Sequence, residues 1–164
     1  MPVPTVYDKL EVNKMSDKVI LDDGSEDGLE MPEPVLHLSL FVCGEKMDFD
    51  EVTETIGFSP TSVRKKEEWP DVSKKQGFAV DEWYFDFPRV ECRAISEQID
   101  RLETLMQPHI NEFCELCHNK NYTVFISIAV DADHRFTPEL CLEKRHIDFI
   151  GRIGAGFGID PYLD

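Results

Sequence analysis

Long apolar runs and cationic side chains are what this 164-residue sequence has least of. No window approaches the roughly 18 continuous apolar residues of a membrane-spanning helix. Residues 1–18 also lack the basic start and apolar stretch of a secretion signal, so we expect a cytoplasmic protein. Lys and Arg number 17 against 33 Asp and Glu, which gives a net charge of −16. Such a field repels nucleic acid and anionic membranes and attracts basic proteins.

Recognisable catalytic patterns are also missing. No serine stands in a nucleophile-elbow motif, and no histidine lies in a recognisable catalytic context. We therefore expect no catalytic residues, no cofactor and no enzyme activity. The five cysteines are an odd number without a secretory context, which indicates free thiols in a reducing compartment.

The first 34 residues differ from the rest of the chain. They hold 9 of the 33 acidic residues and 3 of the 17 basic ones, and residues 21–34 carry Gly and Pro without a core-forming pattern. This composition is typical of a flexible segment. We predict an acidic, partly flexible N-terminal extension at 1–34 and one domain at 35–164.

Alternation of apolar and polar residues predicts the strands of that domain, at residues 35–44, 78–88, 122–131 and 157–164. Apolar residues three and four apart predict helical segments between them, within residues 47–58, 91–122 and 138–156. Runs of alternation separated by helical patterns indicate a sheet packed on helices. The small number of strands favours an α+β fold, a ferredoxin-like two-layer sandwich with an antiparallel sheet packed against helices.

Several residues predict where the helices begin and end. Asp48 or Asp50 is suited to cap the first helix, and Gly57 to end it in a left-handed conformation. Pro108 removes a backbone donor, so the second helical segment is expected to kink or divide there. Thr137, followed by a proline, is expected to start the third helix.

The segment Cys114-Glu-Leu-Cys117-His118 matches the c-type haem attachment pattern, but that chemistry requires export and the motif lies in a predicted helix. A zinc site needs about four ligands, usually with a second pair at defined spacing. His109, His134, His146, Cys92 and Cys141 do not supply that spacing. We therefore predict no metal site, with Cys117 in the core.

Two further motifs have structural interpretations. A dinucleotide-binding glycine loop follows a strand and opens a helix, whereas Gly154, Gly156 and Gly158 follow a helix and precede a strand. Asp131 and Asp133, at the end of a predicted strand, could hold a divalent ion or act as paired carboxylates. Turn and cap roles are the more frequent ones for such acids.

A charged stretch, "IGFSPTSVRKKEEWPD" at 56–71, has the clearest binding potential. Its turn amides and its cations could form an anion site, although a phosphate loop would need more glycines and a helix directly after it. The alternative is a solvated loop whose cations balance neighbouring acids. The candidate binding residues are Arg64, Lys65, Lys66, Trp69 and, on the following strand, Trp83.

The segment "MDFDEVTETIGFSPTSVRKKEEW" resembles bacterial proteins of the DUF4279 family. The strand "DEWYFDF" and the ending "GFGIDPY", with Asp160 and Tyr162, are similar to the same family, and the resemblance covers about residues 35–164. The chain departs from the family pattern at Ile56, where Leu is usual, and at Glu67, where Gly is usual. The resemblance implies a small α+β domain, and some members resemble immunity-type proteins of bacterial toxin systems.

Two hypotheses about function follow. The first is a non-enzymatic protein-binding module, an acidic immunity-type protein that neutralises a basic toxin by electrostatic complementarity. The second is a small-molecule-sensing or regulatory ferredoxin-like domain with its ligand between sheet and helices or at a dimer interface. A hydrolase or metal enzyme that uses the aspartates or the Cys-His motif is the weakest reading.

Overall fold

The computed structural model describes residues 33–133 and 137–163, so residues 1–32 of the predicted extension lie outside the described part. The strands are β1 (Val35–Gly44), β2 (Ser62–Arg64), β3 (Asp81–Asp86), β4 (Val90–Glu91), β5 (Thr123–Ala132) and β6 (Ala155–Leu163). The helices are α2 (Phe49–Ile56), α3 (Asp71–Lys75), α4 (Ile95–Met106), α5 (Ile110–Lys120) and α6 (Lys144–Arg152). Two 3-10 turns, η2 (Lys66–Glu68) and η3 (Gln107–His109), complete a mixed α+β architecture.

The strands form one six-stranded sheet with the order β2-β3-β1-β5-β6, and β4 pairs with the start of β1. Every pair is antiparallel except β5–β6, which is parallel. The expectation of an antiparallel sheet is therefore wrong at its last pair. The cause is the connection, because α6 carries the chain back along the sheet and the next strand then runs in the same direction.

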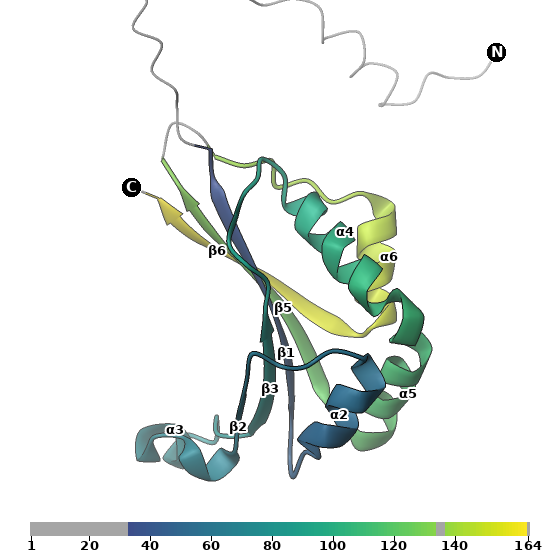
Figure 1. Cartoon of the computed structure of the whole chain (residues 1–164). Coiled ribbons are helices and arrows are strands. Elements are labelled where there is room, and N and C mark those ends of the chain that lie inside the picture. The colour runs from purple at the N-terminus through teal and green to yellow at the C-terminus, as the bar shows by residue number, and fades with distance from the viewer. Residues whose placement is uncertain (1–32, 134–136, 164) are drawn as a thin grey trace, which may run out of the picture. The chain divides into compact units, whose positions relative to one another are not determined.

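Helices α2, α4, α5 and α6 all lie on one face of the sheet (Figure 1). The residues of β1 and β5 that point to this face are buried, as strand alternation predicts: Leu36, Leu38, Leu40, Val42, Val124, Ile126, Ile128 and Val130. Each fully buried Leu, Ile or Val contributes about 1.5–3 kcal/mol to folding. The core therefore lies between one sheet face and the helices.

The first helix begins and ends as predicted. The Asp48 side chain accepts hydrogen bonds from the backbone N–H groups of Asp50 and Glu51, both at 3.1 Å. Gly57 has φ 86°, and its N–H donates to the carbonyl of Thr53 at 3.0 Å. The second helical segment is divided by η3, which contains the predicted breaker, Pro108. No helix of the described residues is long and apolar enough to span a bilayer.

The last helix begins later than predicted, because Thr137 precedes an extended segment. The backbone N–H of Glu139 donates to the carbonyl of Arg93 at 2.6 Å, and its carbonyl accepts from the N–H of Ile95 at 3.1 Å. These bonds to a distant segment use the backbone groups that a helix would need. They connect the segment before α6 to the start of α4.

Candidate functional site

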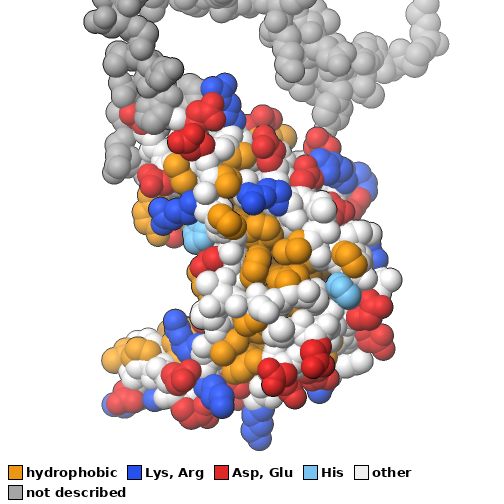
Figure 2. All heavy atoms as spheres, in the orientation of Figure 1, with side chains coloured by type: hydrophobic (Ala, Val, Ile, Leu, Met, Phe, Trp, Pro, Cys, Tyr) orange, Lys and Arg blue, Asp and Glu red, His pale blue; other side chains and the backbone are white. Residues whose placement is uncertain are grey.

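One face of the sheet is left uncovered over its middle by the helices of the described chain. We call it the open face; it is opposite α2, α4, α5 and α6, and α3 projects beyond one end of it (Figure 1). The domain is hollowed on this side, at the left of Figure 2. Because side chains alternate along a strand, the outward positions of β1, β3, β5 and β6 together form its surface.

Three aromatic residues lie abreast across the middle of the open face. Phe41 pairs in register with Tyr84 on one side and with Phe125 on the other, and the ring centroids are 4.8 and 6.4 Å from that of Phe41. Phe125 is 41% exposed. A Cβ atom at Gly156 or Gly158 would lie 2.7 or 2.9 Å from its ring, so these glycines give the ring the space it occupies. We call Tyr84, Phe41 and Phe125 the aromatic row.

A polar cluster adjoins the aromatic row. The Asp86 carboxylate accepts a hydrogen bond from Ser39 Oγ at 2.6 Å and lies 3.2 Å from His37 Nε2. Burial, and then a hydrogen bond to Asp86, raise the pKa of Tyr84. In a Ser-His-Asp triad the imidazole contacts the serine hydroxyl and takes its proton. Here the carboxylate occupies the middle position, so the arrangement suits polar recognition better than acyl transfer.

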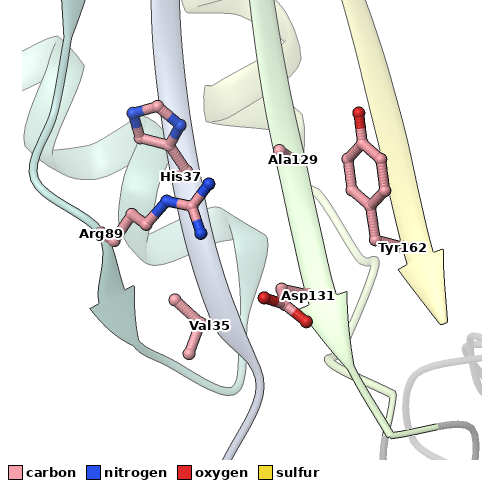
Figure 3. A pocket seen from close by; sticks show the side chains of 6 residues that line it. All are labelled: Val35, His37, Arg89, Ala129, Asp131 and Tyr162. Carbon is pink, nitrogen blue, oxygen red and sulfur yellow. The ribbon is translucent and has the colours of Figure 1, made fainter. Parts of the chain in front are cut away.

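A pocket of about 310 Å³ lies at the end of the open face where β5 and β6 finish. We call it the sheet-end pocket; it is lined by Val35, His37, Arg89, Ala129, Asp131 and Tyr162. Arg89, from the connection between β3 and β4, reaches across β1 towards Asp131 and Tyr162 (Figure 3). The Tyr162 hydroxyl donates to Asp160 at 2.9 Å, which raises the pKa of that tyrosine. The pocket thus presents one cation and one carboxylate together.

Two of the predicted binding residues meet at the opposite end of the open face. The Arg64 guanidinium lies over the Trp69 ring, 4.5 Å from its centroid, and 3.9 Å from the Glu82 carboxylate. Trp69 is held by a 2.8 Å hydrogen bond from Nε1 to the carbonyl of Val80. These contacts form a cation–π pair at the rim of the face.

The two lysines of the predicted site do not converge with that pair on one anion. The Lys66 ammonium donates to Glu45 at 2.7 Å, whereas the Lys65 side chain is exposed. The backbone N–H of Lys66 donates to the buried Asp81 carboxylate at 2.8 Å, and so does the N–H of Met47. Asp81 therefore connects the charged stretch at 56–71 to the turn after β1. These contacts give the stretch a role in holding the fold together.

Trp83, the fifth predicted binding residue, is fully buried (0% exposed). Its Nε1 donates to Thr53 Oγ1 at 3.0 Å, and its ring packs edge-on against Phe58 with centroids 5.9 Å apart. A side chain in this position cannot contact a partner. We therefore assign Trp83 to the core and not to a binding surface.

The Cys114–Cys117–His118 motif lies on α5, and Cys117 is buried as predicted. Burial raises the pKa of Cys117 to about 12 and also raises that of Cys114. Metal ligation needs a thiolate, and this burial opposes its formation at both cysteines. Within residues 33–133 and 137–163, no three His, Cys, Asp or Glu side chains are grouped as a metal site would require; the candidate His134 lies outside these residues.

The remaining motifs are divided between turns and the open face. Gly154, with φ 65°, follows α6 and leads into β6. The strand that was predicted to end at Asp131 runs to Ala132 as β5, and Asp131 lines the sheet-end pocket. Asp133 follows the end of β5. The two aspartates thus differ in position: Asp131 lines the sheet-end pocket, whereas Asp133 lies beyond the end of β5.

A second hollow, of about 570 Å³, lies on the other side of the sheet and is lined by Phe87, Asp100, Arg101, Thr104, Leu105 and Pro108. Hydrophobic side chains gather in the middle of the view in Figure 2. The charged groups of this hollow have partners: Arg101 lies over the Phe87 ring at 5.4 Å, and Asp100 bonds to Arg145 and His146. The second hollow is therefore less suited to a basic ligand than the open face is.

Sequence reasoning missed the aromatic row and Arg89. A signal for the aromatic row was available in the sequence. Phe41 and Phe125 occupy the outward positions of alternating strands whose other positions already form the buried face. For Arg89 no local signal existed, because its site is completed by Asp131 and Tyr162 from distant strands.

The fold and the open face define a small mixed α+β domain in which the described helices leave one sheet face uncovered. The chain belongs to the DUF4279 family, described as a domain of unknown function, whose match covers residues 34–164. The resemblance seen in the sequence is thereby confirmed. No curated protein and no solved structure matches the chain.

Proposed function

We propose that this protein is a non-enzymatic protein-binding module whose open face receives an extended, basic segment of a partner. The observation that carries the proposal is the aromatic row, which lies on a sheet face free of covering helices among the described residues. Exposed aromatic groups supply contact area at low entropic cost and are enriched in protein interfaces.

The charges around the aromatic row favour a basic partner. Asp86 and Asp160 lie at outward positions of β3 and β6, and the protein as a whole carries a net charge of −16. Lys and Arg side chains gain from carboxylates and also from aromatic faces, the latter by about 0.5–1 kcal/mol at exposed sites. A basic segment laid across the row therefore finds both kinds of contact, and the field of the protein accelerates its capture.

The same aromatic platform on a positively charged sheet would suit single-stranded nucleic acid, whose bases stack on such rings. Such sites combine the rings with a cationic groove that follows the phosphates. The net charge of −16 opposes phosphate binding, so we favour a protein over a nucleic acid as the partner.

The strand order supports a ferredoxin-like origin of this scaffold. A β-α-β-β-α-β succession is formed by β1, α2, β2, β3, α4 with α5, and β5. Its four strands lie in the order β2-β3-β1-β5 in the sheet. In this proposal α6 and β6 are an addition that widens the open face by one strand. The extra strand supplies Gly156, Gly158 and Tyr162 to it.

The biological version of the proposal is an acidic immunity-type protein of the cytoplasm that masks a basic toxin. It is supported by the family resemblance and by the charge of the chain, and it requires no catalytic residue. A toxin domain with a basic surface loop or strand is the partner that this chemistry fits.

The experiment compares two double variants that change the net charge equally. Asp86→Asn with Asp160→Asn removes two carboxylates from the open face, whereas Glu112→Gln with Glu115→Gln removes two exposed ones from α5. Each is titrated with a fluorescent Lys/Arg-rich peptide at about 25 and about 300 mM NaCl, so that screening is tested as well. An acidic peptide of the same length serves as the ligand control.

We expect the basic peptide to bind the wild type more tightly at low salt. The open-face variant should lose several-fold more affinity than the α5 variant. Equal losses in the two variants would show that only net charge matters and would refute the proposal. Binding that ignores salt would refute the electrostatic part of it.

A further inference from the structure

The sheet-end pocket holds two opposite charges that do not neutralise each other. Arg89 and Asp131 both line it, yet neither forms an ion pair within 4.0 Å with any described residue. An ion pair between exposed side chains contributes little stability, so little free energy is lost when either group turns to a ligand instead. Each is therefore available to a ligand that fills the space between them.

The walls of the pocket limit what such a ligand can be. The volume of about 310 Å³ is at the lower end of the range of about 300–1,000 Å³ typical of ligand sites. Val35 and Ala129 form an apolar floor, while the rings of His37 and Tyr162 stand on either side (Figure 3). His37 is held in place by its 3.2 Å contact with Asp86.

A lone anion placed at Arg89 would face the Asp131 carboxylate, and a lone amine placed at Asp131 would face the guanidinium. A ligand that carries both charges satisfies both groups. Guanidinium binds carboxylates in a bidentate manner, and a carboxylate accepts the hydrogen bonds of an ammonium group.

We propose that the sheet-end pocket binds a small zwitterion of the α-amino-acid class, with its carboxylate at Arg89 and its ammonium at Asp131. The side chain of the ligand lies along the apolar floor. Because the pocket is open, we expect a dissociation constant of about 0.1–1 mM. This inference is independent of the binding of a protein partner to the aromatic row.

The test begins with NMR titration of the full chain with a panel of the proteinogenic amino acids, following backbone amide shifts. The best ligand is then compared with its deaminated acid and its decarboxylated amine; for leucine these are 4-methylpentanoate and 3-methylbutylamine. We expect saturable shifts at His37, Ala129 and Tyr162 with the amino acid. Each analogue should bind at least about tenfold more weakly, the effect of losing one charge-assisted pair of about 1.4 kcal/mol.

The variants test the two charges separately. Arg89→Gln and Asp131→Asn should each weaken the best amino acid at least about tenfold. Arg101→Gln and Glu112→Gln make the corresponding charge-removing changes on the helical side of the sheet and should change the affinity for the amino acid less than twofold. Both pocket residues are exposed, so the variants should fold, and circular dichroism verifies this.

Three results would overturn the inference. The first is that no amino acid reaches saturation at about 10 mM. The second is that either single-charge analogue binds as tightly as the amino acid, which indicates an anion or amine site. The third is that the control variants weaken binding as much as the pocket variants do. None of these results depends on the basic peptide, so the two proposals fail separately.

Discussion

Replacing Trp83 by Phe tests whether this tryptophan stabilises the core or binds a partner. The substitution removes the 3.0 Å hydrogen bond to Thr53, worth about 0.5–1.5 kcal/mol. It also leaves a gap where part of a fully buried indole was, which adds about 1–3 kcal/mol by analogy with other large-to-small core changes. We therefore expect a loss of about 1.5–4.5 kcal/mol in the free energy of unfolding.

The matched change on the surface is Phe125→Ala. Because Phe125 is 41% exposed, its removal should cost less stability than the about 3–5 kcal/mol of a core phenylalanine. It should instead lower the affinity for the basic peptide about two- to fivefold, the effect of one exposed cation–π contact. Trp83→Phe is thus expected to lower mainly the stability of the protein, and Phe125→Ala mainly its affinity for the peptide.

The assays are urea unfolding followed by circular dichroism, and titration of each folded variant with the same Lys/Arg-rich peptide. Trp83→Phe should shift the unfolding midpoint to lower urea and leave the peptide affinity within twofold of the wild type. A Trp83→Phe protein with unchanged stability and weakened binding would refute the assignment of this residue to the core.

Three further perturbations follow from the described contacts. Gly57→Ala should cost about 1–3 kcal/mol of stability, because Gly57 has φ 86° and the new Cβ would lie 2.6 Å from the His109 ring; a loss below about 0.5 kcal/mol in urea unfolding contradicts this. Hydrogen bonds from Arg145, and then from a neighbouring histidine, lower the pKa of Asp100 below its ordinary value of 3.8. The ionised Asp100 thus stabilises the fold above that value, and this stability is lost as the pH falls through the lower folded pKa. Wild type should therefore lose more stability than Asp100→Asn between about pH 6 and pH 2, and parallel pH profiles would contradict the linkage. Cys141, the exposed thiol, should react with a thiol reagent before the other four, which are buried or half-buried; simultaneous labelling of all five in the folded protein would contradict this order of exposure.

Much of the fold could be predicted because its determinants are local. The Asp48 side chain caps the start of α2, and Gly57, which has no side chain, allows the left-handed conformation at its end. Pro108 divides the next helical segment because it lacks an N–H. The alternation in β1 and β5 was equally informative, since each buries one face. These features require no knowledge of distant neighbours.

What could not be predicted depends on pairing between distant segments. The parallel direction of β6 results from its position beside β5, and the late start of α6 results from the bonds of Glu139 to the segment around Arg93. The short strand β2 and helix α3 have little apolar content and were missed for that reason.

The candidate site shows the same division. Arg64 and Trp69 were predicted together because they lie close in the chain, and the structure brings them into contact, while a binding role for them stays a prediction. Phe41 and Phe125 are far apart in sequence and become neighbours only through the register of β1 and β5. Trp83 was misplaced because strand alternation alone does not reveal which face the helices cover.

The most direct test of the central claim is to map the basic peptide on the protein by amide NMR shifts. The account predicts that the largest shifts lie on β1, β3, β5 and β6, centred on Phe41, Tyr84 and Phe125, and that they diminish in the Phe125→Ala variant. Shifts centred instead on α4 and α5, or around Phe87 and Leu105 in the second hollow, would contradict it.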